Sequence, residues 1–310
     1  MSEFKHYSVM LNECIEALNV GDGYYLDLTA GGGGHSLEII KRISDGKLVA
    51  LDQDGAAIEA VTKRLEPYKD KLITVRDNFA NIGAVADNLG IKSVRGALID
   101  LGVSSYQLDT PERGFSYMHD APLDMRMSDT AALTAYDVVN GYSRDELKRI
   151  LRDYGEESFA PLIASQIVKR REENPINTTF ELVDVIKSAL PAKAKNGAHH
   201  PCKRSFQAIR IEVNRELDVI EPALRAVVSL LESGGRLAVI TFHSLEDRIA
   251  KQTFASLAQG CTCPPSFPVC VCGNKPVIRL VNKKPILPGA AELEENPRSR
   301  SAKLRIIEKL

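Results

Sequence analysis

The stretch YYLDLTAGGGGHS, residues 24–36, decides the fold. Its apolar first half is typical of a buried β-strand, and four glycines, Gly31 to Gly34, separate it from a helical pattern over residues 35–42. Because glycine has no Cβ, the backbone can approach a ligand closely there, and the first N–H groups of a helix have no partner within it. A strand, a glycine turn and a helix in this order therefore predict a site for a nucleoside cofactor.

Asp52 supports the same prediction. It ends the next apolar run, residues 47–52, about 20 residues beyond the glycines, a spacing that suits a carboxylate hydrogen-bonded to ribose hydroxyls. The alternative is that the glycines form only a tight connection, but the strand, the helix and Asp52 together favour binding. A dinucleotide fingerprint would carry its third glycine where this chain has Ser36. This difference favours an adenosine cofactor without a pyrophosphate.

Short apolar runs alternate with helical patterns in the first third of the chain, as in a parallel sheet with right-handed crossovers. The strands expected there span residues 24–29, 47–52, 71–76 and 96–101. From Gln107 to Arg204 the pattern is of loops and helices, with helices expected over 144–153, 159–173 and 179–190. Beyond it we expect a long amphipathic helix over 205–231, a strand over 236–241, a helix over 245–257 and an antiparallel hairpin of 277–281 with 303–308.

These elements predict an α/β protein with a seven-stranded, Rossmann-like sheet of the methyltransferase kind, because a terminal hairpin fits that sheet better than the six-stranded dinucleotide fold. A helical insertion follows the fourth strand. We expect the core to comprise residues 1–106 and 205–310 and the insertion residues 107–204. The length of 310 residues suits one α/β core with an insertion.

Asp100 is the candidate catalytic residue. It ends the fourth expected strand, and open α/β sheets bind ligands at the carboxyl ends of their strands. A carboxylate there can accept a hydrogen bond from an exocyclic amine and orient its nitrogen toward an electrophilic methyl group. The alternative is a carboxylate that caps the next helix or turn. For Phe79 and His243, core packing and a structural role are favoured over stacking on a purine and proton relay, whereas Asp27 either binds the cofactor or satisfies the glycine turn.

The net charge of −1 leaves nucleic-acid binding to local clusters of basic residues. Residues 113–127 combine arginines with aromatic side chains, so they form either a lid over a base or an ordinary surface loop. Two basic groups follow: Lys193, Lys195, Lys203, Arg204 and Arg210, with His199 and His200, and then Arg298, Arg300, Lys303 and Arg305. Charge runs are usually solvated faces, but a localised polyanion footprint is reasonable here. The arginines singled out for RNA contact are Arg113, Arg126, Arg204 and Arg210.

Four cysteines, Cys261, Cys263, Cys270 and Cys272, lie close together in the sequence. Four thiolates satisfy a tetrahedral zinc site, although the usual spacing within each pair is two residues rather than one, so structural zinc and plain thiols stay open as alternatives. No apolar run is long enough for a membrane span, and the first residues do not read as a signal peptide. We therefore expect a cytoplasmic protein with reduced cysteines and no membrane partner.

The assembled motifs resemble those of the ribosomal small subunit methyltransferase H family, the cytosine-N4 methyltransferases of 16S rRNA. The similarity extends from His6 to residues 296–301. The stretches that carry it are AGGGGHS at 30–36, LIDLGVSS at 98–105, ERGFS at 112–116, PLDMRM at 122–127 and ITFHSLEDR at 240–248. So many matches in family order make chance an inadequate explanation.

The resemblance implies S-adenosyl-L-methionine as methyl donor and a cytosine in the decoding region of 16S rRNA as acceptor. It places the cofactor against Gly33, Gly34 and His35, with Asp52 at the ribose and Phe79 beside the adenine. Asp100 and Gln107 would complete the site near the reacting centre, and the insertion would recognise the substrate. Amino-methyltransferases commonly carry Asp/Asn-Pro-Pro-aromatic at the fourth strand, whereas here Leu101 and Gly102 follow Asp100. Tyr106 or Phe115 is then the candidate to stack on the base.

Two other functions compete with this one. A nicotinamide-dependent oxidoreductase uses a similar glycine turn, and a non-catalytic RNA-binding or assembly factor can keep a cofactor fold. The missing third glycine weakens the first, and the presence of Asp52 and Asp100 weakens the second. The sequence leaves open whether the partner is free 16S rRNA or the small ribosomal subunit, and whether the chain forms a homodimer.

Overall fold

The computed structural model describes residues 8–195, 200–264, 269 and 271–310. The chain divides into two compact units, one formed by Met1–Gly102 with Leu217–Leu310 and the other by Val103–Glu216. We describe each unit by itself and call them the sheet unit and the helical unit.

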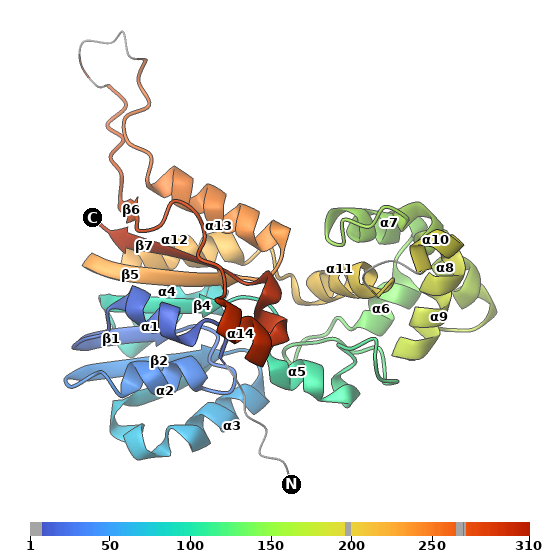
Figure 1. Ribbon diagram of the computed structural model, residues 1–310, viewed down its shortest axis with the longest axis horizontal. Coiled ribbons are helices and arrows are strands. Elements are labelled where there is room, and N and C mark those ends of the chain that lie inside the picture. Colours follow the sequence, from blue (N-terminus) through green and yellow to red (C-terminus); the bar gives the residue numbers. More distant parts are fainter. Residues whose placement is uncertain (1–7, 196–199, 265–268, 270) are drawn as a thin grey trace. The chain divides into compact units, whose positions relative to one another are not determined.

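The sheet unit contains a seven-stranded sheet in the order β3-β2-β1-β4-β5-β7-β6 (Figure 1). Strands β1 to β5 pair in parallel, whereas β7 lies antiparallel between β5 and β6. The strands are β1 Gly23–Asp27, β2 Gly46–Asp52, β3 Leu72–Arg76, β4 Val94–Asp100, β5 Leu231–Thr241, β6 Ile278–Leu280 and β7 Lys303–Lys309. The predicted seven-stranded Rossmann-like sheet and its closing hairpin are confirmed.

Helices cover both faces of this sheet because alternate residues of each strand point to opposite sides. In β2, Val49 and Leu51 belong to one buried cluster, while Leu48 and Ala50 belong to the other. The first cluster includes side chains of α4, α12 and α13, and the second includes those of α1, α2 and α3. The helices are α1 Leu11–Leu18, α2 Gly34–Ile40, α3 Gly55–Arg64, α4 Ile82–Leu89, α12 Ile220–Leu230, α13 Ser244–Leu257 and α14 Ala290–Glu295, with short 3-10 turns η1 Glu66–Lys71, η2 Phe79–Asn81 and η4 Pro297–Ser301.

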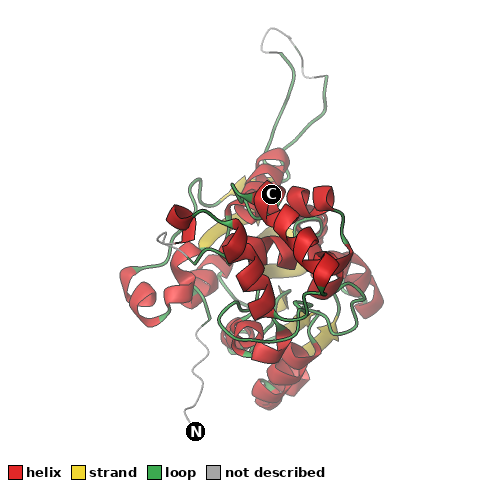
Figure 2. Cartoon of the chain, turned by 90° about the vertical axis from the view of Figure 1, so that its right-hand side faces the viewer, coloured by secondary structure: helices red, strands yellow, loops and turns green. Residues whose placement is uncertain are grey.

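The helical unit has a hydrophobic core of its own. Leu147, Ile163, Leu182 and Phe206 are among its buried members, and they come from four different helices. Its elements are α5 Ser105–Asp109, η3 Pro111–Arg113, α6 Ala135–Gly141, α7 Arg144–Asp153, α8 Ala160–Glu173, α9 Thr179–Ala189, α10 Ala192–Lys195 and α11 Lys203–Asn214 (Figure 1). Figure 2 shows the helices of the chain in red. The helices expected over 144–153, 159–173 and 179–190 are therefore confirmed as α7, α8 and α9.

The prediction of a single helix over 205–231 was wrong. The chain forms α11 and α12 instead, and Arg215 ends α11 in the left-handed conformation with φ of 49°. Apolar spacing continues through the break because both helices are amphipathic, but α11 packs in the core of the helical unit and α12 on the sheet. Periodicity alone cannot distinguish one buried stripe from two.

Among the residues that the structure describes, no helix combines the length and the apolar character needed to cross a membrane.

Candidate functional site

The predicted site residues of the sheet unit gather at one edge of the sheet. Because β1, β2, β4 and β5 run parallel, their carboxyl ends share that edge. The glycine turn follows β1, Asp52 ends β2 and Asp100 ends β4. Backbone hydrogen bonds continue beyond the strands, from Leu28 N to Leu98 O at 3.0 Å and from Ala30 N to Leu51 O at 3.0 Å. The turn is therefore fixed to both neighbouring strands.

The glycine turn needs glycine for two separate reasons. Gly31 and Gly33 have φ of 48° and 74°, in the left-handed region that other L-residues rarely adopt. A Cβ on Gly33 would lie 3.0 Å from Val61 Cγ2, and one on Gly34 would overlap the hydroxyl of Ser8. His35 is buried, with Nε2 3.0 Å from the carbonyl oxygen of Val9. Helix α3 and the segment before α1 thus pack against the turn.

Asp52 contacts the glycine turn directly. Its Oδ2 accepts a hydrogen bond from Gly31 N at 2.9 Å, and its Oδ1 accepts one from Asp54 N at 2.9 Å. Burial raises the pKa of this carboxyl, although the backbone N–H donors partly offset the effect. The two sequence signals for a nucleoside site, the glycines and the carboxylate that follows them, are therefore hydrogen-bonded to each other.

Asp27 supports the glycine turn, one of the two roles that the sequence left open for it. It is buried, and its Oδ2 accepts a hydrogen bond from the Ser36 hydroxyl at 2.6 Å while its Oδ1 accepts one from Thr29 N at 3.3 Å. Burial raises its pKa to about 6, although the hydrogen bond from Ser36 favours the charged form and lowers the pKa in part. The hydrogen bonds of Asp27 thus hold the two ends of the turn, and this carboxyl takes up a proton close to neutral pH.

Asp100 has a side-chain oxygen without a partner. Its backbone N–H donates to Thr29 Oγ1 at 2.7 Å, but among the described residues nothing donates to its buried Oδ1. Burial raises its pKa well above the ordinary value, and the negative charges of Asp27 and Glu246 raise it further. A buried carboxyl oxygen without a donor is energetically unfavourable, so this atom is suited to an incoming N–H group.

Asp100 is not the cap of the following helix, the role considered as its alternative. Ser104 caps α5, accepting a hydrogen bond at its Oγ from Gln107 N at 3.2 Å. The buried side chain of Gln107 completes this capping box, since its Oε1 accepts from Ser104 N at 3.0 Å. The structure therefore gives Gln107 a local role at the start of the helical unit.

Phe79 packs against the core of the sheet unit and His243 caps a helix. Phe79 is half-buried against the core cluster of α4, α12 and α13, in the 3-10 turn that Asn78 caps. His243 caps α13, and its Nε2 lies 3.0 Å from Oε1 of the buried Glu246, whose Oε2 accepts from Phe242 N at 2.7 Å. His243 thus caps α13 beside the site, and its buried Nε2, although close to Glu246, makes no hydrogen bond among the described residues.

The sequence analysis missed three polar side chains at this edge. Thr29 accepts from the backbone of Asp100, and Asn78 Nδ2 donates to Gln53 Oε1 at 3.0 Å, which ties the loop after β3 to the loop after β2. Each of the three directly follows or lies within two residues of a strand end. Their position just after a strand could have identified them, because Asp52 and Asp100 were chosen for the same reason.

All four arginines singled out for RNA contact donate hydrogen bonds to protein groups, and Arg204 is the exposed one. Arg113 Nη2 donates to the carbonyl oxygens of Arg126 and Met127 at 2.7 and 3.1 Å. Arg126 binds Asp124 with two hydrogen bonds of 3.0 and 2.7 Å, and Arg210 binds the buried Glu216 with two of 2.7 and 2.8 Å. Arg204 is exposed and donates to the carbonyl oxygen of Glu156 at 3.1 Å.

The other candidates for RNA contact also differ in exposure. Phe115 is only 6% exposed and packs in the core of the helical unit, whereas Tyr106 is 52% exposed. In the C-terminal basic group, Lys303 and Arg305 form ion pairs with Asp247 at 3.3 and 2.7 Å. His199 lies outside the described residues. Tyr106 is thus the better-placed of the two aromatic candidates.

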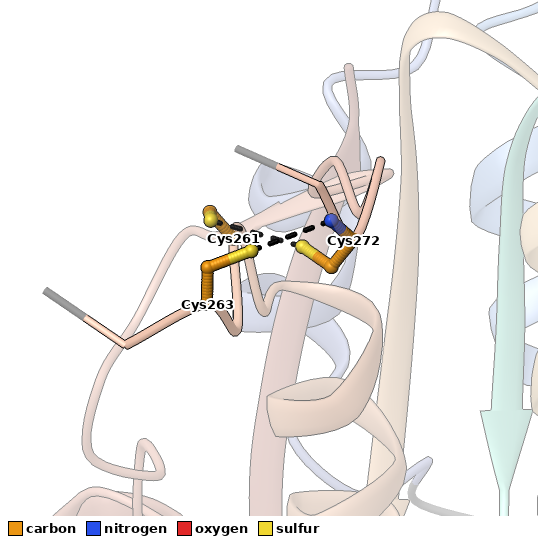
Figure 3. Close-up of side chains that lie close together, drawn as sticks. All are labelled: Cys261, Cys263 and Cys272. Carbon is orange, nitrogen blue, oxygen red and sulfur yellow. Dashed lines mark hydrogen bonds between the residues drawn. The ribbon is translucent and has the colours of Figure 1, made fainter. Parts of the chain in front are cut away.

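The cysteines form a cluster apart from this edge. Cys261, Cys263 and Cys272 lie together in the loop between α13 and β6 (Figure 3), with their sulfur atoms all within 4.8 Å of one another. Cys270 lies outside the described residues.

The chain is similar to known proteins over almost its whole length. A model of the MraW methylase family matches residues 3–310. The chain is 54% identical over 312 residues to "Ribosomal RNA small subunit methyltransferase H" of Ruminiclostridium cellulolyticum, covering 99% of this chain and all of that protein. It is 56% identical over 310 residues to the protein of the same name from Clostridium botulinum and to "Ribosomal RNA small subunit methyltransferase H 2" of Agathobacter rectalis, again over 99% of this chain and at least 99% of each relative. A solved structure of a putative rRNA methylase from Clostridium thermocellum aligns with 98% of this chain and 99% of that chain at 11% identity and a TM-score of 0.46, too distant to bear on function.

Proposed function

This chain belongs to the MraW methylase family, and on that premise we propose that it transfers a methyl group from S-adenosyl-L-methionine to the N4 amine of a cytosine in the decoding region of 16S rRNA. The buried Oδ1 of Asp100 carries the proposal, because none of the described residues donates a hydrogen bond to it at the edge where a ligand of this fold binds. An exocyclic amine supplies the missing donor.

The residues of the glycine turn fit the cofactor. Gly31 and Gly33 keep the backbone free of side chains, and Asp52 is fixed against Gly31. The carboxylate of Asp52 accepts backbone hydrogen bonds from Gly31, Gln53 and Asp54, and with about four lone-pair sites it retains capacity for a ribose hydroxyl. Gly33, Gly34 and His35 form the start of α2, and Phe79 and Gln107 complete the proposed set. When bound, the sulfonium of the cofactor supplies an electrophilic methyl group.

Asp100 acts on the acceptor. Its Oδ1 accepts a hydrogen bond from one N–H of the amine, which holds the nitrogen in line with the methyl group and increases its electron density. When the methyl group passes to the nitrogen, its bond to the sulfonium sulfur would break and release the neutral thioether, and Asp100 would take the proton that the amine loses. The raised pKa of Asp100 makes its ionised form a stronger base for this proton.

The helical unit is the proposed substrate-recognition domain. Arg204 is the exposed member of the four arginines proposed for RNA contact, and Lys193 and Lys203 are exposed near it in the sequence. Arg113, Arg126 and Arg210 act by shaping the backbone of that unit, since their guanidinium groups hold carbonyls and carboxylates. Tyr106 is the candidate for stacking on the target base. On this proposal the protein works in the cytoplasm, where its rRNA partner is found.

The test is nucleoside mass spectrometry of small-subunit rRNA from cells that lack the protein, complemented with the unaltered chain, with Asp100→Asn or with Asp70→Asn. The unaltered chain and Asp70→Asn, a change of an exposed carboxylate in η1, should restore one N4-methylcytidine, and Asp100→Asn should not. A methyl group on another base would refute the acceptor assignment. Purified protein given naked 16S rRNA or small subunits would then identify the true substrate.

Two competing functions predict different results. Calorimetry should show binding of S-adenosyl-L-methionine and no binding of a nicotinamide dinucleotide, and the reverse would support an oxidoreductase. Binding of rRNA without methyl incorporation in either substrate would support a non-catalytic assembly factor.

A further inference from the structure

The loop between α13 and β6, residues 258–277, is here called the cysteine loop. Val277 N donates to Leu257 O at 2.9 Å, and Asn274 Nδ2 donates to the carbonyl oxygens of Gln259 and Gly260 at 3.1 and 2.8 Å, so the two ends of the loop are joined. None of its described residues from Cys261 onward is buried, and Val271 is 73% exposed. Because the described part of the loop has no apolar core, another interaction must hold its fold.

Three thiols in this loop have the spacing of ligands around one ion. The sulfur atoms of Cys261, Cys263 and Cys272 lie within 4.8 Å of one another, and those of Cys261 and Cys272 are 3.7 Å apart (Figure 3). In a tetrahedral site with Zn–S bonds of about 2.3 Å, neighbouring sulfurs are about 3.8 Å apart. A disulfide would need about 2.05 Å. The observed distance thus matches shared coordination.

Backbone N–H groups surround the sulfurs. Val271 N and Cys272 N both donate to Cys263 Sγ at 3.3 Å, and Thr262 N donates to Cys272 Sγ at 3.3 Å. Such N–H donors stabilise negative charge on sulfur. A metal binds the thiolate, and N–H···S bonds are the outer-shell contacts that orient such ligands.

We propose that Cys261, Cys263 and Cys272 bind one Zn²⁺ ion that holds together the two described arms of the cysteine loop, residues 258–264 and 271–277. Thiolate sulfur is a soft ligand that selects zinc over magnesium or calcium. The proposal rests on the three described thiols and does not depend on Cys270.

The site is structural rather than catalytic. Strand β6 runs antiparallel to β7, which runs antiparallel to β5, so β6 begins at the edge opposite the carboxyl ends of β1 to β5. Helix α13 starts at the carboxyl end of β5 and leads back to that opposite edge, where the cysteine loop begins (Figure 1). The ion would therefore lie far from Asp100, and the proposal is independent of the proposed function.

The test uses the full chain purified in reducing buffer with zinc. We expect one zinc per chain by elemental analysis, and cobalt substitution should give a thiolate-to-cobalt charge-transfer band. Loss of outer-shell contacts alone weakens metal binding by about 10–100-fold, so loss of a ligand in Cys261→Ser or Cys272→Ser should weaken it by more than about 100-fold in competition with a chelating dye. The control, Val271→Ala, changes an exposed neighbour and keeps all three thiols.

Several outcomes would overturn the proposal. These are a zinc-free unaltered protein, full zinc retention in both serine variants, and a Cys261–Cys272 disulfide found by mass spectrometry after alkylation of free thiols. The cobalt band is measured on the unaltered chain, so it gives an answer even where a serine variant fails to fold. Methyl transfer by the serine variants should stay within about twofold of the unaltered chain, and a larger loss in a folded variant would contradict a purely structural role.

Discussion

Carboxylates at the sheet edge and carboxylates in the helical unit are held in opposite ways. Asp27, Asp52 and Asp100 are surrounded by backbone N–H groups, a hydroxyl and other acids, and burial raises the pKa of all three. Asp124 is also partly buried, but two hydrogen bonds from Arg126 outweigh that effect and lower its pKa. Glu216 is likewise held by two hydrogen bonds from Arg210.

The difference separates acids whose charge is compensated by a guanidinium from acids that lie, without a cation, at the proposed ligand site. A carboxylate bound by a guanidinium has its charge compensated within the protein. A buried carboxylate without a cation destabilises the folded chain near neutral pH, so it persists where function requires it. The following predictions test this contrast.

The largest effect is expected for Asp100→Asn, which keeps the shape of the side chain and removes its basic oxygen. We expect kcat to fall by about 10²- to 10⁴-fold, the usual contribution of a positioned general base. The affinity for S-adenosyl-L-methionine should change little. At the same time the free energy of unfolding at pH 7 should rise, because a buried charge disappears. Radiolabelled methyl transfer, calorimetry and urea unfolding measure the three quantities, and a variant that is both active and destabilised would break the contrast.

Arg210→Met should give the opposite result in the helical unit. It leaves Glu216 buried without its cation, and removing one partner of a buried ion pair costs about 3–5 kcal/mol. Urea unfolding should show this loss, with unchanged affinity for the methyl donor. The double variant Arg210→Met with Glu216→Leu should recover much of the stability, and failure to recover would mean that the pair is not what the arginine stabilises.

Asp27→Asn should stabilise the protein at pH 7 by up to about 3 kcal/mol. Between the ordinary pKa of 3.8 and the folded value of about 6, the folded chain holds a proton that the unfolded chain has lost, so the free energy of unfolding falls as pH rises through this window. Urea unfolding at pH 4, 5, 6 and 7 should show a smaller fall for Asp27→Asn than for the unaltered chain. An identical pH profile would contradict the raised pKa.

The smallest effect is expected for Asp124→Asn, with the sign reversed. Its folded pKa is lowered, so its contribution to stability is present above the ordinary value of 3.8 and is lost as pH falls through the folded pKa. The pair is partly exposed, so we expect a loss of about 1–2 kcal/mol at pH 7 that disappears in acid. A gain in stability at pH 7 would contradict the lowered pKa of Asp124 and mean that it behaves like the carboxylates at the sheet edge.

The sequence predicted what depends on local pattern. Apolar runs bounded by glycines and polar residues located β1 to β5, and the position of Asp52 and Asp100 at strand ends placed them at one edge. It did not reveal the break at Arg215, because both helices keep apolar periodicity across it. Nor could it reveal that Arg210 is bound by Glu216, since the identity of a charged residue does not determine whether its charge is free. Such pairings depend on tertiary packing.

The place of β7 has a consequence for biosynthesis. This strand is made after all the others, yet it lies between β5 and β6 and pairs with both. The helical unit, with a core of its own, is complete in the nascent chain much earlier. During translation we therefore expect the helical unit to fold first. Until β7 is synthesised, β5 is an edge strand with unpaired backbone groups, to which chaperones can bind.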